Sequence, residues 1–282
     1  MLIGRIHNVN KGDFMRLIIL LMILSLSCFS KTIVLEKGNF VLFNGEVDDS
    51  SVGPVKREVF DLINQDNFVE TKEIYLVLNT PGGDVSSGID MIEFITALPV
   101  KIPTITMFAA SMGFQFAENL GHRYILESGI LMAHKMSGGV QGEISKHNGQ
   151  LENRLKLWED RQERMDQVCA DRAKMSIKAF QALMENEYWC EGQSCVDKGF
   201  ADEVVKVSCG KSLIGFEQKT VIVEFMGMSF KVNAKFPNCP LLSPYDVKIV
   251  NGNEEKNLGE MPADQQKAIN NALGIGLKNS LK

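Results

Sequence analysis

The stretch IYLVLNTPGGD, residues 74–84, decides the fold of this 282-residue chain. Its first five residues form an uninterrupted apolar run, which is typical of a parallel strand covered on both faces. The Pro81-Gly82-Gly83 sequence that follows predicts a turn, because two glycines give access to positive φ. Residues 86–98 then place apolar side chains at helical spacing up to Pro99, which predicts a helix that ends there.

The same order of strand and helix repeats along the chain. Residues 104–108 form a second buried strand that ends in Ala-Ala-Ser-Met-Gly, residues 109–113, before a helix to about Leu120. Two separate strands are expected next, Tyr124–Leu126 and Ile130–Ala133. Further strands are expected at 33–35, 40–43 and 203–207, and further helices at 52–64, 144–176, 177–185 and 194–198. Strands that alternate with helices in this way indicate an α/β domain with mainly parallel strands.

The pattern changes after about residue 207. Residues 220–225 and 229–236 indicate a β-hairpin, residues 251–259 are polar and loop-like, and residues 262–275 predict a final helix. We therefore expect a larger α/β domain at 31–207, followed by a small α+β appendage at 208–282.

The N-terminus has the pattern of a secretory signal peptide. Lys11 and Arg16 flank an apolar run, Leu17–Leu26, which small residues follow. The run is shorter than the roughly 20 residues that a membrane span needs. We expect residues 1–30 to be a signal peptide, with 1–14 an upstream extension if Met15 is the true start, and the mature protein to be periplasmic or secreted. An uncleaved signal, or a lipid on Cys28, would instead hold the protein at a membrane, and a buried N-terminal helix is the remaining alternative.

Composition narrows the classes of partner and cofactor. A net charge of -5 and an aromatic content of 8% argue against a nucleic-acid partner, because no basic stripe is present to neutralise phosphates. The cysteines show no zinc-site spacing, and we expect neither a metal nor a cofactor. In an oxidising compartment some would pair, and Cys190 could close a small loop with Cys195. The five cysteines after Cys28 are an odd number, so at least one stays free or pairs between chains: Cys169, Cys190, Cys195, Cys209 and Cys239.

Three candidate functional features follow predicted strands. Ser111 ends one strand and precedes a helix whose N-terminal amides point to the same place. His134 ends another strand, and Gly82-Gly83 follows a third with amides that can stabilise an oxyanion. Each feature has an ordinary structural explanation as a helix cap, a surface histidine or a turn. Together, at one sheet edge, they indicate nucleophilic catalysis by a serine with a histidine base.

The sequence also resembles a known family. The stretches IYLVLNTPGGDVSSGIDMIEFI, TMFAASMGFQFAENLGHRYIL and ILMAHKMSGGVQGE are similar to the proteolytic subunit of the Clp protease, and the similarity extends from about Val34 to Val207. The resemblance implies the ClpP/crotonase fold, in which ββα units form a right-handed spiral, and a Ser-His-Asp triad. It implies that Ser111 is the nucleophile and His134 the base, with the amides of Gly83 and Met112 as oxyanion donors. It also implies a loop that binds extended peptide by strand addition, formed by Gly138, Gly139, Val140, Gln141 and Gly142.

The third triad position departs from the family pattern. The resemblance aligns Glu187 with the expected aspartate, and a glutamate can also orient an imidazole. A shift of one residue would offer Asn186 instead, and Glu187 as a solvated loop carboxylate is the third option. Related signal peptide peptidases use a Ser-Lys dyad, but Lys135 directly follows His134 and would point to the opposite face of a strand. Tyr188 and Trp189 are expected to be packing residues.

Three functions remain open at this stage. The first is a serine peptidase that acts on peptides or unfolded proteins, as a homo-oligomer and, if exported, without an ATP-driven unfoldase. The second is a non-catalytic oligomeric scaffold with the same fold. The third is a crotonase-type acyl-CoA enzyme, which needs no Ser-His pair. The long helix with Leu151, Leu155 and Trp158 matches the family's ring-stacking handle or is an ordinary amphipathic helix.

Overall fold

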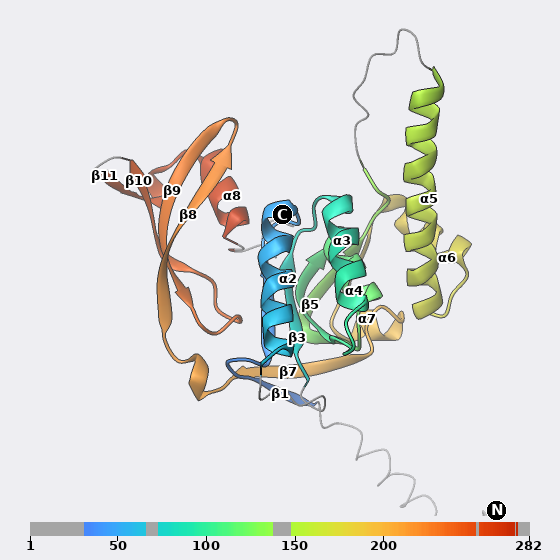
Figure 1. Ribbon diagram of the computed structural model, residues 1–282, viewed down its shortest axis with the longest axis horizontal. Coiled ribbons are helices and arrows are strands. Elements are labelled where there is room, and N and C mark those ends of the chain that lie inside the picture. The colour runs from blue at the N-terminus through green and yellow to red at the C-terminus, as the bar shows by residue number, and fades with distance from the viewer. Residues whose placement is uncertain (1–30, 66–72, 138–147, 252–253, 274, 276–282) are drawn as a thin grey trace, which may run out of the picture. The chain divides into compact units, whose positions relative to one another are not determined.

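The computed structural model (Figure 1) describes residues 31–65, 73–137, 148–251, 254–273 and 275. The predicted signal peptide and the predicted peptide-binding loop, Gly138–Gly142, lie outside the described residues. From Thr32 onward the chain forms one unit. Within the described residues, no helix has the length and apolar character needed to cross a membrane.

The main sheet is parallel except at one edge of β5. Its strands lie in the order β1-β7-β5-β4-β3-β2, with β6 paired antiparallel to β5. The parallel pairs are β1 with β7, β7 with β5, β5 with β4, β4 with β3, and β3 with β2. The strands are β1 (Thr32–Leu35), β2 (Phe40–Asn44), β3 (Tyr75–Thr80), β4 (Thr104–Ala110), β5 (Arg123–Ala133), β6 (Tyr188–Glu191) and β7 (Glu203–Cys209). The prediction of an α/β fold with mainly parallel strands is confirmed, and the architecture is consistent with the ClpP/crotonase-like fold.

Helices pack on one face of this sheet and form the largest apolar core. This core buries side chains from several strands and helices, among them Phe43, Leu76, Leu78, Phe114 and Phe180. Burial of apolar area stabilises the fold by roughly 25 cal/mol per Å². The helices are α2 (Asp49–Ile63), α3 (Val85–Thr96), α4 (Met112–Asn119), α5 (Asn148–Arg172), α6 (Ile177–Leu183) and α7 (Gln193–Asp197).

An aspartate is the N-cap residue of two of these helices, α2 and α3. The Asp48 carboxylate accepts a hydrogen bond from the Ser51 amide at 2.8 Å, and the Ser51 hydroxyl accepts one from the Asp48 amide at 3.0 Å. Asp84 accepts from the Ser87 amide at 2.7 Å, and the hydrogen bonds from Ser87 lower the pKa of Asp84. The second cap fixes the point where the Gly82-Gly83 turn enters α3.

Strand β5 corrects the prediction of two separate strands. Its first residues pair with β7, and residues 130–133 pair with β6. The register between β4 and β5 shifts once, between Thr106 and Phe108. Gly129 lies beside this shift, where a Cβ atom would come within 2.6 Å of the Thr106 carbonyl oxygen. The exposed Glu127 and Ser128 interrupt the apolar pattern without ending the strand.

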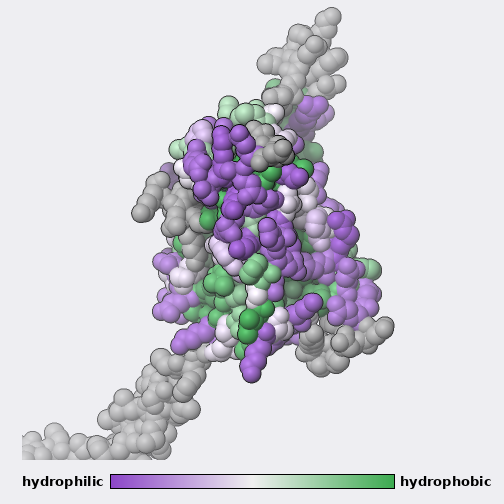
Figure 2. Space-filling view, turned by 90° about the vertical axis from the view of Figure 1, so that its left-hand side faces the viewer, coloured by the Kyte–Doolittle hydropathy of each residue, from purple (hydrophilic) through white to green (hydrophobic). Residues whose placement is uncertain are grey.

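A second sheet is built from the C-terminal residues. It is antiparallel in the order β11-β10-β9-β8, formed by β8 (Phe216–Phe225), β9 (Met228–Pro237), β10 (Tyr245–Asn251) and β11 (Glu254–Asn257). With α8 (Ala263–Ala272) it buries a small core that includes Val232, Ile249 and Ile269. The predicted hairpin is confirmed, but the predicted loop at 251–259 is wrong, because Glu254–Asn257 pairs with β10. Figure 2 shows one side of the molecule, on which hydrophilic residues predominate and hydrophobic residues form smaller groups between them.

Four of the five cysteines after Cys28 form disulfides. Cys190 pairs with Cys195, as predicted, and Cys209 pairs with Cys239. Cys169 is free and buried in the main core. The second bridge links the end of β7 to the segment that follows β9.

Candidate active site

Ser111 lies at the junction of β4 and α4 in a backbone conformation that non-glycine residues rarely adopt. Its φ is 55° and its ψ is -115°. Such a conformation costs on the order of 1–3 kcal/mol and persists only where the surrounding structure enforces it. Here the Ser111 amide donates to the Met132 carbonyl of β5 at 2.9 Å. The Ser111 side chain occupies the N-cap position of α4 but makes no capping hydrogen bond.

The turn after β3 packs directly against this serine. A Cβ atom on Gly82 would lie 2.6 Å from the Ser111 Cβ and 2.5 Å from the Ala110 carbonyl oxygen. Gly82 also has a φ of 89°, so both the space and the conformation require glycine. The turn predicted from Pro81-Gly82-Gly83 is therefore present, and it touches the candidate nucleophile.

His134 follows the last residue of β5 and reaches the same place. Its Nε2 atom lies 2.7 Å from the Ser111 Oγ atom, within hydrogen-bond distance. Both side chains are half-buried, so the pair is sheltered but accessible. The structure thus brings together the serine and the histidine that the sequence placed at neighbouring strand ends.

The two predicted oxyanion amides are free to bind a ligand. The Gly82 carbonyl accepts a hydrogen bond from the Val47 amide at 2.8 Å. In a trans peptide the next amide points the opposite way, so the Gly83 N–H faces away from Val47, toward the β4 side where Ser111 lies. Met112 is the first residue of α4 and has no partner four residues earlier. Within the described residues, neither amide donates a hydrogen bond.

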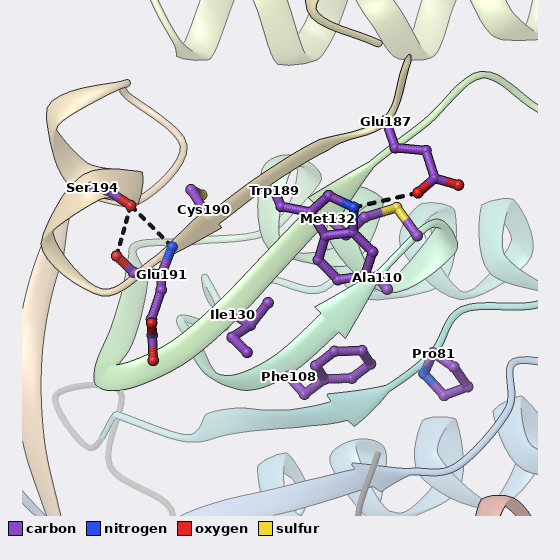
Figure 3. Close-up of a pocket in the computed structure, with 10 residues that line it drawn as sticks. All are labelled: Pro81, Phe108, Ala110, Ile130, Met132, Glu187, Trp189, Cys190, Glu191 and Ser194. Atoms are coloured by element: carbon purple, nitrogen blue, oxygen red, sulfur yellow. Dashed lines mark hydrogen bonds between the residues drawn. The ribbon is translucent and has the colours of Figure 1, made fainter. Parts of the chain in front are cut away.

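Glu187 lies near the histidine but does not contact it. The last pair in the register of β5 and β6 is Ala133 with Tyr188, so His134 directly follows one strand of this pair and Glu187 directly precedes the other. Glu187 is exposed, with a φ of 61°, and its carboxylate accepts a hydrogen bond from the Trp189 indole at 3.3 Å (Figure 3). Among the described residues, no hydrogen bond joins His134 to Glu187 or to Asn186.

Comparison with known proteins identifies the family. The model of the Clp protease family matches residues 27–208 of this chain. ATP-dependent Clp protease proteolytic subunits are 31% identical over 177 residues, which cover 61% of this chain and 87% of each relative. Those relatives come from Streptococcus pyogenes serotype M5 (strain Manfredo), Streptococcus equi subsp. equi (strain 4047) and Streptococcus equi subsp. zooepidemicus (strain H70). The chain belongs to the Clp protease family. This membership supports a peptidase.

Lys135 is directed away from the Ser111–His134 pair of this Clp protease family member. Its ammonium group lies 3.9 Å from the Glu185 carboxylate, and both side chains are exposed. The structure therefore places Lys135 in a surface ion pair, and within the described residues no hydrogen bond joins it to Ser111.

The segment after His134 is held by helix α5. The Met136 amide donates to the Gln162 side-chain oxygen at 2.6 Å, and the Gln162 amide donates to Asp166 at 2.5 Å. Asp166 is almost fully buried and also accepts from Gln181 of α6 at 3.0 Å. Burial raises the pKa of Asp166 above its usual value, and the hydrogen bonds from the Gln181 and Gln162 side chains only partly offset this rise. This network was not found from the sequence, since its polar residues look like the solvent-facing side of a charged helix.

A second polar network lies at the other end of β5. The Arg123 guanidinium donates to Glu118 at 2.7 Å and to Asp202 at 2.5 Å, and Arg172 lies 3.5 Å from Asp202. Glu118 is completely buried, and burial raises its pKa to about 8, although Arg123 and Arg172 oppose the rise. The network joins α4, β5, α5 and the segment before β7. In the described part of the chain, no group of three or more potential metal-ligating side chains is arranged to bind an ion.

Proposed function

We propose that this member of the Clp protease family is a serine peptidase in which Ser111 attacks the peptide carbonyl and His134 is its base. The observation that carries the proposal is the 2.7 Å contact between the His134 Nε2 atom and the Ser111 Oγ atom. A serine hydroxyl is a poor nucleophile by itself, and an adjacent histidine activates it by accepting its proton.

The reaction proceeds by acyl transfer. As Ser111 attacks, its proton passes to His134, and the carbonyl oxygen becomes an oxyanion. His134 then returns the proton to the leaving amine, which leaves the acyl group on Ser111. A water molecule activated by the same histidine hydrolyses this ester and restores the free serine.

The amides of Gly83 and Met112 are the proposed oxyanion donors. Both are unpaired, one at the turn that touches Ser111 and the other at the N-terminus of α4. The helix N-terminus adds a partial positive charge at the same point. Removal of one such donor in other hydrolases lowers the rate by about 10²–10³.

Glu187 is the proposed orienting residue for His134. The β5–β6 register supports this role, because residues 134 and 187 are the chain neighbours of the last pair, Ala133 with Tyr188. In the proposed reaction the carboxylate turns from the Trp189 indole to the His134 Nδ1 atom, where it stabilises the imidazolium. In this structure the Glu187 carboxylate binds Trp189 and not His134. This is the one observation that favours the alternative, a non-catalytic oligomeric scaffold.

Substrate binding and assembly belong to the same proposal. We propose that Gly138, Gly139, Val140, Gln141 and Gly142 bind extended peptide as an added strand, and that the chain forms a homo-oligomer. Exposed apolar residues on α5 support an assembly surface: Leu151, Leu155, Leu157 and Trp158.

We also propose that the protein is exported. The apolar run after Lys11 and Arg16 supports this, and so do the two disulfides, which are typical of oxidising compartments. An exported enzyme has no ATP-driven unfoldase beside it, so its substrates would be peptides or unfolded proteins. N-terminal sequencing of the protein from a periplasmic fraction tests this: a first residue near Ser27 or Ser30 supports export, and an intact N-terminus in a cytoplasmic fraction contradicts it.

Hydrolysis of unfolded casein and of short fluorogenic peptides by the purified protein tests the peptidase function. Wild type is expected to cleave both, and Ser111→Ala is expected to be inactive with an unchanged circular dichroism spectrum. As a matched control, Glu93→Gln changes an exposed residue of α3 outside the site and should retain full activity. A folded wild type that cleaves neither substrate, or a Ser111→Ala variant that remains active, contradicts the proposal.

A further inference from the structure

A pocket opens beside Ser111 on the sheet face that carries His134. Its volume is about 840 Å³. The lining residues come from β4, β5 and β6, from the turn after β3, from the residue before β6 and from α7, as Figure 3 shows: Pro81, Phe108, Ala110, Ile130, Met132, Glu187, Trp189, Cys190, Glu191 and Ser194. Ala110 and Pro81 are the chain neighbours of Ser111 and Gly82, so the pocket begins next to the candidate nucleophile.

The strand registers arrange most of these residues in rows. Ala110 pairs with Met132, which pairs with Trp189, and this row lies next to the dyad. Phe108, Ile130 and Glu191 form the following row. Two residues along a strand span about 6–7 Å, so the second row lies within reach of a long side chain beside the cleaved bond.

Phe108, Ile130 and Met132 form an apolar floor, and the charged residues that line the pocket around it are all acidic. Trp189 and Glu191 of β6 line the pocket, and so does Glu187, which precedes the strand and binds the Trp189 indole, so two carboxylates lie near this side chain. Within the described residues, the Glu191 carboxylate has no hydrogen bond or ion pair. The Ser194 hydroxyl is already bonded to the Glu191 backbone, and the described lining contains no Lys, Arg or His.

We infer that this pocket is a substrate subsite for a basic side chain, Lys or Arg, of the residue next to the cleaved bond. The apolar floor takes the methylene stem, and the cationic head lies by Trp189 and Glu191. Glu191 is exposed, and a basic side chain would give its carboxylate an ion-pair partner that a purely apolar side chain would not. The inference rests on the proposed peptidase function and adds a substrate class to it.

Cleavage of internally quenched peptides tests the preference. The peptides Gly-Ala-X-Ala-Gly carry Lys, norleucine or Glu at X, where norleucine has the stem of lysine without the charge. The Lys peptide is expected to be cleaved next to X with a kcat/KM about tenfold above that of the norleucine peptide, and the Glu peptide should be the poorest. The Lys/norleucine ratio should fall to about two in Glu191→Gln and stay unchanged in Glu93→Gln.

A binding measurement separates failure of this inference from failure of the peptidase function. The chain has two tryptophans, so a Ser111→Ala/Trp158→Phe variant reports on Trp189 alone and cannot turn over. Acetyl-Ala-Lys-Ala-amide should change the Trp189 fluorescence with a Kd about tenfold below that of the corresponding norleucine peptide. Because salt screens charge interactions, 0.5 M salt should reduce this difference in Kd.

Selective binding of the Lys peptide without any Ser111-dependent cleavage supports the subsite and contradicts the peptidase proposal. Ser111-dependent cleavage with equal binding and equal kcat/KM for Lys and norleucine overturns the subsite. Trp189 fluorescence that responds to protein concentration but to no peptide also overturns it, because a second copy of the chain then covers the pocket.

Discussion

Glu187 and His134 lie next to the last residue pair of β5 and β6, Tyr188 with Ala133, yet the Glu187 carboxylate binds the indole of Trp189. Each residue is one position beyond a strand, and neighbouring strands lie only about 4.8 Å apart. We propose that reorientation of the Glu187 side chain toward His134 completes the triad.

Replacement of Glu187 tests this relationship. Glu187→Ala is expected to slow the reaction of Ser111 with a fluorophosphonate at least about tenfold, because His134 loses the carboxylate that stabilises its protonated form. Stopped labelling followed by mass spectrometry measures the rate, and Glu93→Gln is the control. A Glu187→Ala variant that labels as fast as wild type would show that the histidine acts without this partner.

Backbone strain at Ser111 predicts an unusual order of stabilities. Alanine retains the cost of a φ of 55° and glycine does not, so Ser111→Gly should unfold at higher denaturant concentration than Ser111→Ala. The difference in the free energy of unfolding should be about 1 kcal/mol, although glycine usually destabilises a folded chain. Urea titration of both inactive variants measures it, and the reverse order would mean that residue 111 is unstrained.

Burial of Glu118 predicts a dependence of stability on pH. Its pKa is about 8 in the folded protein and near 4.5 when exposed, so between these values the folded protein holds a proton that the unfolded chain has released. The free energy of unfolding should therefore fall as the pH rises through this window.

Urea unfolding at pH 5, 7 and 9 measures the effect. Relative to Glu118→Gln, which cannot titrate there, wild type should lose at least about 1 kcal/mol between pH 5 and pH 9. Parallel profiles for the two proteins would show that Arg123 keeps Glu118 charged throughout.

The two disulfides should differ in their contributions to stability. The Cys209–Cys239 bridge closes a separation of 30 residues and the Cys190–Cys195 bridge one of 5. In the chain-entropy description the longer loop is worth about 1.5 kcal/mol more. Comparing the oxidised and reduced forms of Cys190→Ala/Cys195→Ala and of Cys209→Ala/Cys239→Ala isolates each bridge. Equal losses on reduction would contradict the expectation.

Local sequence patterns were sufficient to predict the parts of the site that follow an apolar strand with a distinctive sequence at its end. The runs before Gly82 and Ser111 are of this kind, and the strand into His134 is another, so the three parts of the site could be placed at one edge. Strand β6 was missed because Tyr188–Glu191 is short and follows a helix directly. Its alternation of inward Cys190 and outward Trp189 and Glu191 is the signal that could have found it.

Long-range burial could not be predicted in the same way. Glu118 looks like an exposed helix residue, but in the fold it is buried beside Arg123, which Asp202 holds from 79 residues away, and near the charge of Arg172. Trp189 was expected to be a packing residue; it is 38% exposed and lines the pocket. In both cases the environment is set by segments that meet only in the folded chain.

The central claim is that Ser111 is a nucleophile activated by His134, and covalent labelling tests it most directly. Purified, folded wild type treated with a fluorophosphonate is expected to gain one adduct, mapped to Ser111 by peptide mass spectrometry, while His134→Ala labels at least about 10²-fold more slowly. An unlabelled Ser111 in the folded wild type, or a His134→Ala variant that labels at the wild-type rate, would contradict the account.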